Sequence, residues 1–155
     1  YVAKLMRIEH IIHKNPLELS GGQVQRVAFG STFIMEPRIL VLDECTTQLD
    51  PLGSEEIFDI VKELNQKGIT VIMVDHDMER VARCADQIMV LDQGEVVAID
   101  TPQNIFGNPE IAAHKIGIPD FATICRVLKE KGYTDKEIEV REEETIELVK
   151  EAMAG

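Results

Sequence analysis

The chain has 155 residues, about the length of one domain, and 45% of them are apolar, which is enough to fill a core. Its net charge of −12 argues against a general nucleic-acid binder and against a protein held on anionic lipid by its own charge. No apolar run approaches the roughly 18 residues of a membrane span. The three cysteines, at positions 45, 84 and 125, form no CxxC pair, so their spacing excludes a zinc knuckle and fits a reducing cytoplasm.

Three short apolar segments that each end in Asp predict strands buried on both faces. They cover residues 39–43, 69–75 and 88–92. Between the first two, Ile57, Ile60, Val61 and Leu64 follow helical spacing, with Ser54 as a candidate cap and Gly68 as the end. Alternating strands and helices predict a parallel α/β sheet with right-handed crossovers. Residues 93–94 predict a tight turn into a further strand over 95–99.

The pattern changes after residue 100. Thr101-Pro102 and Asn108-Pro109 each resemble an N-cap followed by proline at the first helical position. Two amphipathic helices are predicted beyond them. The first presents Phe121, Ile124, Cys125 and Leu128 and ends at Gly132, and the second presents Ile146, Val149 and Met153. Residues 1–100 therefore form the predicted α/β part, and residues 101–155 form a helical C-terminal extension.

The strongest local motif is the run Leu19-Ser20-Gly21-Gly22-Gln23. Ser20 and Gln23 have the spacing of a capping box at a helix start. The two glycines allow a backbone or an oxyanion to approach closely, and a helix N-terminus suits a phosphate. On the residues alone, the run fits either an anion site or a plain capped helix.

Two adjacent carboxylates, Asp43 and Glu44, follow the first predicted strand. The carboxyl ends of parallel strands are where ligands bind to such sheets. Asp43 is a candidate ligand of Mg²⁺, through water, and Glu44 is a candidate general base for an attacking water. A strand-end helix cap is the alternative interpretation of the same two residues.

Two further segments carry candidate functional residues. Thr47-Gln48-Leu49-Asp50 lies just downstream of the carboxylates, and His76 follows the second predicted strand. A histidine at a strand's carboxyl end can donate a hydrogen bond to a γ-phosphate oxygen, although a lone histidine is more often structural. Asp77 is a candidate cap for the helix that comes next.

These segments occur in an order and at separations that resemble the second half of an ATP-binding-cassette (ABC) ATPase. The resemblance implies a partial P-loop NTPase (RecA-like) fold and an activity that binds and hydrolyses ATP with Mg²⁺. Leu19 to Gln23 matches the family signature, whose Ser20, Gly21, Gly22 and Gln23 would contact ATP held by an opposite subunit. Asp43 matches the Walker B aspartate that serves Mg²⁺, and Glu44 matches the catalytic base. Asp50 matches the D-loop at the dimer interface, and His76 matches the switch histidine.

The C-terminal part narrows the resemblance to importer-type ATPases. Residues 94–98 and 101–106 are similar to that group, and residues 116–132 with the last helix are similar to the extension of energy-coupling-factor ATPases. That group drives uptake of vitamins or of cobalt and nickel ions. The resemblance implies a second ATPase subunit and a transmembrane transporter subunit as partners, at the cytoplasmic face of the cell membrane, with no nucleic acid.

The sequence departs from the family pattern in three places. Cys45 stands where proline is usual, and Thr47-Gln48 stands where Ser-Ala is common. The P-loop motif GxxxxGK[ST] does not occur in the 155 residues. Because the P-loop supplies the phosphate cradle and its lysine, we expect the chain to be the later portion of an ATPase, inactive alone, with exposed strand edges.

Two other functions compete with the transport ATPase. The first is the C-terminal ATPase lobe of a chromosome-maintenance or DNA-repair protein, although residues 1–18 show no heptad run and the charge is acidic. The second is a non-catalytic module that binds a partner through residues 101–155. Glu44 and His76 are both intact, which does not favour a degenerate site.

Overall fold

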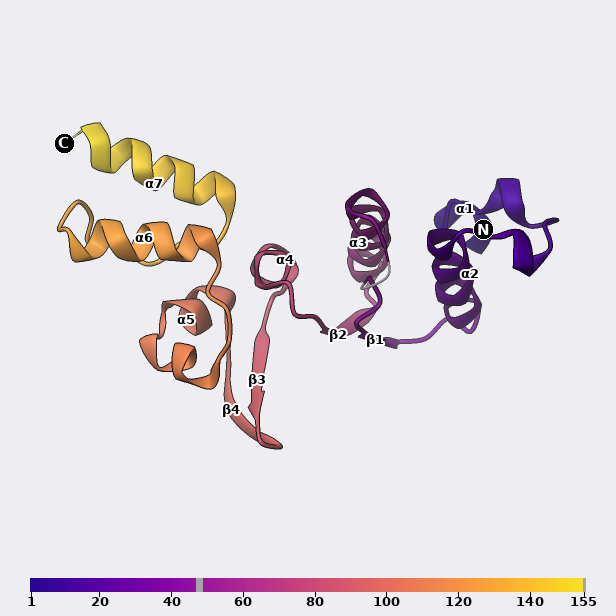
Figure 1. The fold of residues 1–155 in the computed structure, drawn as a ribbon, viewed down its shortest axis with the longest axis horizontal. Helices are drawn as coiled ribbons and strands as arrows, with labels where there is room; N and C mark the ends of the chain where they lie inside the picture. Colours follow the sequence, from indigo (N-terminus) through magenta and orange to yellow (C-terminus); the bar gives the residue numbers. More distant parts are fainter. Residues whose placement is uncertain (47–48, 155) are drawn as a thin grey trace. The chain divides into compact units, whose positions relative to one another are not determined.

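The structure is a computed structural model that describes residues 1–46 and 49–154 (Figure 1). The chain forms two compact units, Tyr1–Asp75 and His76–Gly155, and each is described by itself. The two units are defined by which residues pack against one another. The predicted boundary at residue 100, between the ATPase part and the extension, stays a prediction.

The first unit combines helices with a parallel pair of strands. Its elements in chain order are α1 (Val2–Leu5), η1 (Glu9–Ile11), η2 (Pro16–Glu18), α2 (Gly21–Phe33), β1 (Ile39–Asp43), α3 (Pro51–Gln66) and β2 (Thr70–Val74). β1 and β2 pair in parallel register, from Ile39 opposite Thr70 to Asp43 opposite Val74. The parallel α/β arrangement predicted from the sequence is confirmed.

Helix α3 begins one turn earlier than its apolar spacing suggests. Asp50 is the N-cap and accepts a hydrogen bond from the Gly53 N–H at 2.6 Å, with Pro51 in the first turn. Ser54, the predicted cap, lies inside the helix and is buried. That prediction is wrong because an aspartate before proline caps a helix as well as serine does, and here it comes first. The predicted end is confirmed, since Gly68 has a φ of +89° directly after the helix.

The core of the first unit lies between the helices and one face of the β1–β2 pair. Its buried residues include Phe29 and Phe33 from α2, Leu40 and Leu42 from β1, and Ile57, Ile60 and Leu64 from α3. Figure 1 shows α3 on one side of the two strands. Successive strand residues point to opposite faces, so only alternate residues of β1 reach this core.

The other face of the same two strands is apolar and exposed. Val41 is 64% exposed and its partner Ile72 is 52% exposed. The prediction that these strands are buried on both faces is therefore wrong for the described residues. The helices of the first unit share a core with the inward-facing strand residues only, and a parallel sheet usually has both faces covered.

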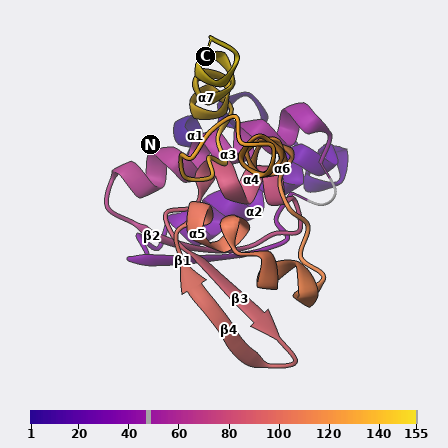
Figure 2. The ribbon, with the colours of Figure 1, turned by 90° about the vertical axis from the view of Figure 1, so that its left-hand side faces the viewer.

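The second unit contains a hairpin and several helices. Its elements are α4 (Met78–Cys84), β3 (Ile88–Asp92), β4 (Glu95–Asp100), α5 (Pro102–Gly107), η3 (Pro109–His114), α6 (Asp120–Glu130) and α7 (Glu142–Ala154). Figure 2 shows β3 and β4 as a long two-stranded hairpin. Its core is formed by Ala82, Val90, Ile105, Phe106, Ile111, Ala122 and Val140.

The third predicted strand joins a different sheet from the one expected. β3 pairs with β4 in antiparallel register, and in the described residues each sheet has two strands. Gln93 and Gly94 have φ values of +50° and +83°, as a two-residue hairpin turn with both central residues at positive φ requires. This turn, which the sequence predicted, brings the two strands together locally. The continuous apolar run of 88–92 did not reveal that pairing.

The helical segments after residue 100 form where they were predicted. Thr101 and Asn108 cap α5 and η3 through their side chains, each with proline in the first turn. α6 and α7 pack side by side. The predicted face of α7 is wrong, because Met153 is exposed while Thr145 and Leu148 are buried. Successive residues of a helix are rotated by roughly 100° about its axis. A pattern shifted by one position therefore places a different set of side chains on the buried face.

The two faces of β1 offer a test of this arrangement. We expect Leu40→Ala, which removes a buried side chain, to lower the free energy of unfolding of the first unit by about 2–5 kcal/mol. Val41→Ala, on the exposed face of the same strand, should cost about 1 kcal/mol or less. Urea unfolding followed by circular dichroism measures both. Equal losses in the two variants would contradict the assignment of the two faces.

Candidate functional site

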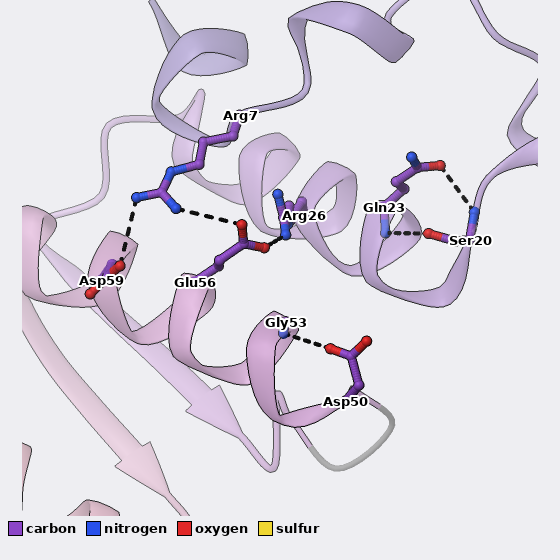
Figure 3. A network of polar contacts seen from close by, with 8 residues as sticks. All are labelled: Arg7, Ser20, Gln23, Arg26, Asp50, Gly53, Glu56 and Asp59. Carbon is purple, nitrogen blue, oxygen red and sulfur yellow. Dashed lines mark hydrogen bonds and ion pairs between the residues drawn. The ribbon is translucent and has the colours of Figure 1, made fainter.

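Helix α2 begins with the predicted capping box. The Ser20 hydroxyl accepts a hydrogen bond from the Gln23 N–H at 3.4 Å, and the Gln23 side-chain oxygen accepts one from the Ser20 N–H at 3.1 Å (Figure 3). Ser20 and Gly21 are exposed. A Cβ added to Gly21 would meet no heavy atom within 4 Å, so the first turn of the helix is open to an approaching group.

The same helix start lies beside the segment that leads into α3. A Cβ added to Gly22 would lie 3.6 Å from Cδ2 of Leu49, which precedes the Asp50 cap. Thr47 and Gln48, the other residues of the predicted D-loop, lie outside the described residues. Gly22 of the signature run and Leu49 therefore lie close together in the first unit, and Figure 3 shows Ser20 and Gln23 at the start of α2 and Asp50 at the start of α3.

Asp43 and Glu44 lie at the carboxyl end of β1, and both are exposed. Glu44 has a φ of +43°, an uncommon conformation for a residue other than glycine. Its N–H donates to the Val74 carbonyl at 3.0 Å, which extends the pairing with β2 by one residue beyond the strand. The predicted carboxylates thus lie at the strand edge where ligands bind in parallel sheets.

Gln25 connects this carboxylate turn to α2. Its side-chain Nε2 donates to the carbonyl oxygen of Cys45 at 2.8 Å. Cys45 is the residue that follows Glu44, and both Gln25 and Cys45 are half-buried. Gln25 is not among the site residues predicted from the sequence. Its position two residues after Gln23, within the signature helix, was the available signal, but nothing in a single sequence identifies the acceptor.

Ion pairs hold α2 and the N-terminal segment against α3 (Figure 3). Arg26 pairs with Glu56, and Arg7 lies 3.7 Å from carboxylate oxygens of both Glu56 and Asp59. Arg26 and Glu56 are the more enclosed of these side chains. These contacts were also missed, because they join residues that are thirty or more positions apart in sequence.

His76 belongs to the second unit, of which it is the first residue. It is exposed and lies between β2 and α4. The predicted action of His76 on the same nucleotide as Asp43 and Glu44, which lie in the first unit, stays a prediction. The following residue caps α4 as expected, since the Asp77 side chain accepts from the Arg80 N–H at 3.1 Å.

The carboxyl end of β1 fits Mg²⁺ in the manner typical of nucleotide sites. The described residues contain no group of three or more His, Cys, Asp or Glu that could enclose a metal ion. Mg²⁺ commonly takes one or two carboxylates and fills its other positions with water and substrate phosphates. The exposed Asp43 carboxylate supplies a donor of the right chemistry for that mode.

No helix in the described part of the chain is both long enough and apolar enough to cross a bilayer.

Sequence comparisons show that the chain is similar to ATP-binding proteins of ABC transporters. Residues 2–47 match the family model described as ABC transporter. The energy-coupling factor transporter ATP-binding protein EcfA2 of Streptococcus pyogenes serotype M5 (strain Manfredo) is 38% identical over 143 residues. The EcfA2 of a serotype M3 strain (ATCC BAA-595 / MGAS315) is equally similar. The matched region is 92% of this chain and 51% of each relative, so the chain spans about half the length of these curated relatives.

Solved structures give the same result. CbiO1 of Clostridium perfringens, described as part of the ABC transporter complex cbiONQ, is 32% identical with a TM-score of 0.64. The match covers 83% of this chain and 51% of that one. The ADP conformation of MJ1267, an ATP-binding cassette of an ABC transporter, is 28% identical with a TM-score of 0.67 over 75% of this chain and 47% of that one. The chain therefore contains part of the ATP-binding cassette of an ABC transporter and resembles the energy-coupling-factor ATP-binding proteins.

Proposed function

We propose that this chain is the portion of an ATP-hydrolysing transporter subunit that carries the signature, the Walker B carboxylates, the D-loop aspartate and the switch histidine. One observation carries the proposal. The Glu44 turn, in its left-handed conformation, is hydrogen-bonded through Gln25 to the helix that starts at Ser20 and Gly21. A carboxylate turn and an open helix start are both parts that hydrolysis of a nucleoside triphosphate uses, and one unit of this chain carries the two.

Each carboxylate has a separate role in this proposal. Asp43 holds Mg²⁺ through water, and the ion neutralises charge on the phosphate oxygens when it is bound. Glu44 orients the attacking water and accepts its proton, which its exposed position at the strand edge permits. His76 donates a hydrogen bond to the γ-phosphate once it is brought to the same nucleotide.

The signature residues serve a nucleotide held by another subunit. Ser20, Gly21, Gly22 and Gln23 would meet the γ-phosphate of that nucleotide at the start of α2, with Asp50 at the subunit interface. The capping box fixes the direction of the helix, and the open space beside Gly21 leaves room for a phosphate. The proposal therefore includes a dimer, formed with a second copy or with a paralogous ATPase.

The names of the relatives support the proposal of an importer. The curated relatives are energy-coupling factor transporter proteins, and CbiO1 is described as part of the cbiONQ complex. We infer an importer of vitamins or of cobalt or nickel ions, in which a transmembrane subunit binds the solute. This subunit would work at the cytoplasmic face of the membrane, with residues 101–155 as its C-terminal extension.

The competing DNA-repair function receives no support from the N-terminal segment. Residues before α2 form one four-residue helix and two three-residue 3₁₀ turns instead of a long coiled-coil helix. The relatives reported above are all transport ATPases. The non-catalytic alternative has no observation in its favour, since both Walker B carboxylates stand at the strand edge.

Nucleotide binding tests the proposal that this chain carries only part of the ATP site. We expect the 155-residue chain to bind no Mg-ATP up to millimolar concentration and to hydrolyse none, because no P-loop cradle is present in its sequence. The same chain joined to the P-loop segment of an EcfA2 relative should bind at micromolar concentration. Isothermal titration calorimetry measures both. Micromolar binding by the 155-residue chain alone would mean that another phosphate cradle exists in it.

The role of Glu44 as general base is tested in the same protein, the chain joined to a P-loop segment. Glu44→Gln removes the proton acceptor, so turnover should fall by about 10²–10⁴-fold while ATP affinity changes little. Glu36→Gln is the matched control, because Glu36 is also exposed and also has a positive φ, of +50°, but precedes β1. A coupled phosphate-release assay gives the rates. If Glu44→Gln kept the parent rate, Glu44 would not be the base.

A further inference from the structure

We propose that Gln25 is a positioning residue that holds the turn carrying Glu44 to the start of the signature helix, so that these two parts of the first unit move together. What Glu44 does in the reaction rests on the function proposed above. The hydrogen bond from Gln25 does not rest on that function. The positioning role of Gln25 and the proposed function can therefore be tested separately.

The first step of the argument is the conformation of the turn. Glu44 has a φ of +43°, in the left-handed region that disfavours residues with a side chain. Such a conformation persists only where neighbouring groups hold it, and it is common at functional sites. The usual stiffening residue of the family is absent here, because Cys45 occupies the position after Glu44. Other contacts of the turn must therefore restrain it.

The second step identifies what holds the turn. The Glu44 N–H donates to the Val74 carbonyl at 3.0 Å, which fixes one side of the turn to β2. On the other side, Gln25 Nε2 donates to the Cys45 carbonyl at 2.8 Å, which fixes it to α2. The two bonds bracket a single peptide unit, the one between Glu44 and Cys45. Its orientation sets the direction in which the Glu44 side chain leaves the backbone.

The third step concerns the helix from which Gln25 reaches. α2 is anchored at its start by the Ser20 capping box and along its side by the Arg26–Glu56 ion pair with α3. Gln25 is therefore extended from a helix that has anchors of its own at its start and along its side. Its hydrogen bond connects a displacement of the helix start to the Glu44 turn.

This geometry gives Gln25 a role in coordination between two nucleotides. In the proposed dimer, Ser20 and Gly21 meet the nucleotide of the opposite subunit, whereas Glu44 serves the nucleotide of its own subunit. Gln25 forms a direct side-chain link between the helix start and the Glu44 turn. Engagement of the signature helix by one nucleotide would then set the base at the other.

The thiol of Cys45 provides a reporter that needs no nucleotide. In a Cys84→Ser background, which removes the exposed cysteine, we compare Gln25→Glu with Arg26→Ala. Gln25→Glu keeps the shape of the side chain but replaces the donor with an acceptor. Alkylation of Cys45 should become about three- to tenfold faster, as expected for loss of one hydrogen bond. The carbonyl ¹³C resonance of residue 45 should move upfield.

Arg26→Ala is the matched control, because it loosens the same helix from α3 but leaves the Gln25 bond intact. It should leave the residue-45 carbonyl resonance and the alkylation rate near their parent values. Equal effects in the two variants, or no effect of Gln25→Glu, would overturn the proposal. If Gln25→Glu does not fold, proton exchange of the Gln25 side-chain amide in the parent chain decides instead. It should be at least tenfold slower than for the exposed Gln66, and equal rates would overturn the proposal.

The chain joined to a P-loop segment tests the effect of Gln25 on turnover separately from its hydrogen bond to the Glu44 turn. Gln25→Glu should lower kcat about tenfold and leave the KM for ATP within about twofold, because the base is misplaced while the nucleotide cradle is not. An unchanged kcat together with faster Cys45 alkylation would remove the link to Glu44. An active parent protein with unchanged Cys45 alkylation in Gln25→Glu would leave the proposed function standing and overturn the role of Gln25.

Discussion

The parallel pairing of β1 with β2 is the constraint on which the candidate site depends. Parallel strands end at the same edge of a sheet, so the register that sets Asp43 opposite Val74 also sets where the chain leaves both strands. Glu44 continues that pairing for one more residue through its N–H. Burial of Leu40 and Leu42 against the helices keeps this register, because a slip by one residue would turn both side chains to the outer face.

Local patterns in the sequence were sufficient for most of the fold. Ser20 with Gln23, Thr101 before Pro102 and Gln93 before Gly94 specify a cap, a helix start and a hairpin turn through bonds that span at most four residues. Such features depend on few neighbours, and tertiary structure has little opportunity to override them. The strand positions followed in the same way from short apolar runs.

The predictions that were wrong concern segments whose pairing or burial depends on which neighbouring element covers them. An apolar run such as 88–92 fits either a parallel or an antiparallel strand, and the hairpin turn decided the pairing of β3. The exposure of Val41 has the same origin, since composition does not say which face of a strand the helices cover. In the site, Gln25 and Glu56 could not be identified because their partners lie twenty or more residues away. Single-sequence reasoning has no access to such contacts.

Capping and ligand binding, treated as alternatives in the sequence, are compatible in the structure. Ser20 and Asp50 each cap a helix at a position that the ABC resemblance assigns to nucleotide contact or to the interface. A cap uses the N–H of the third helical residue, here that of Gln23 or Gly53, and fixes the axis of the helix. A helix start that is fixed in direction presents its earlier N–H groups to a ligand with less conformational entropy to lose. In the proposed function, the cap formed by Ser20 is thus what prepares the start of α2 for an anion.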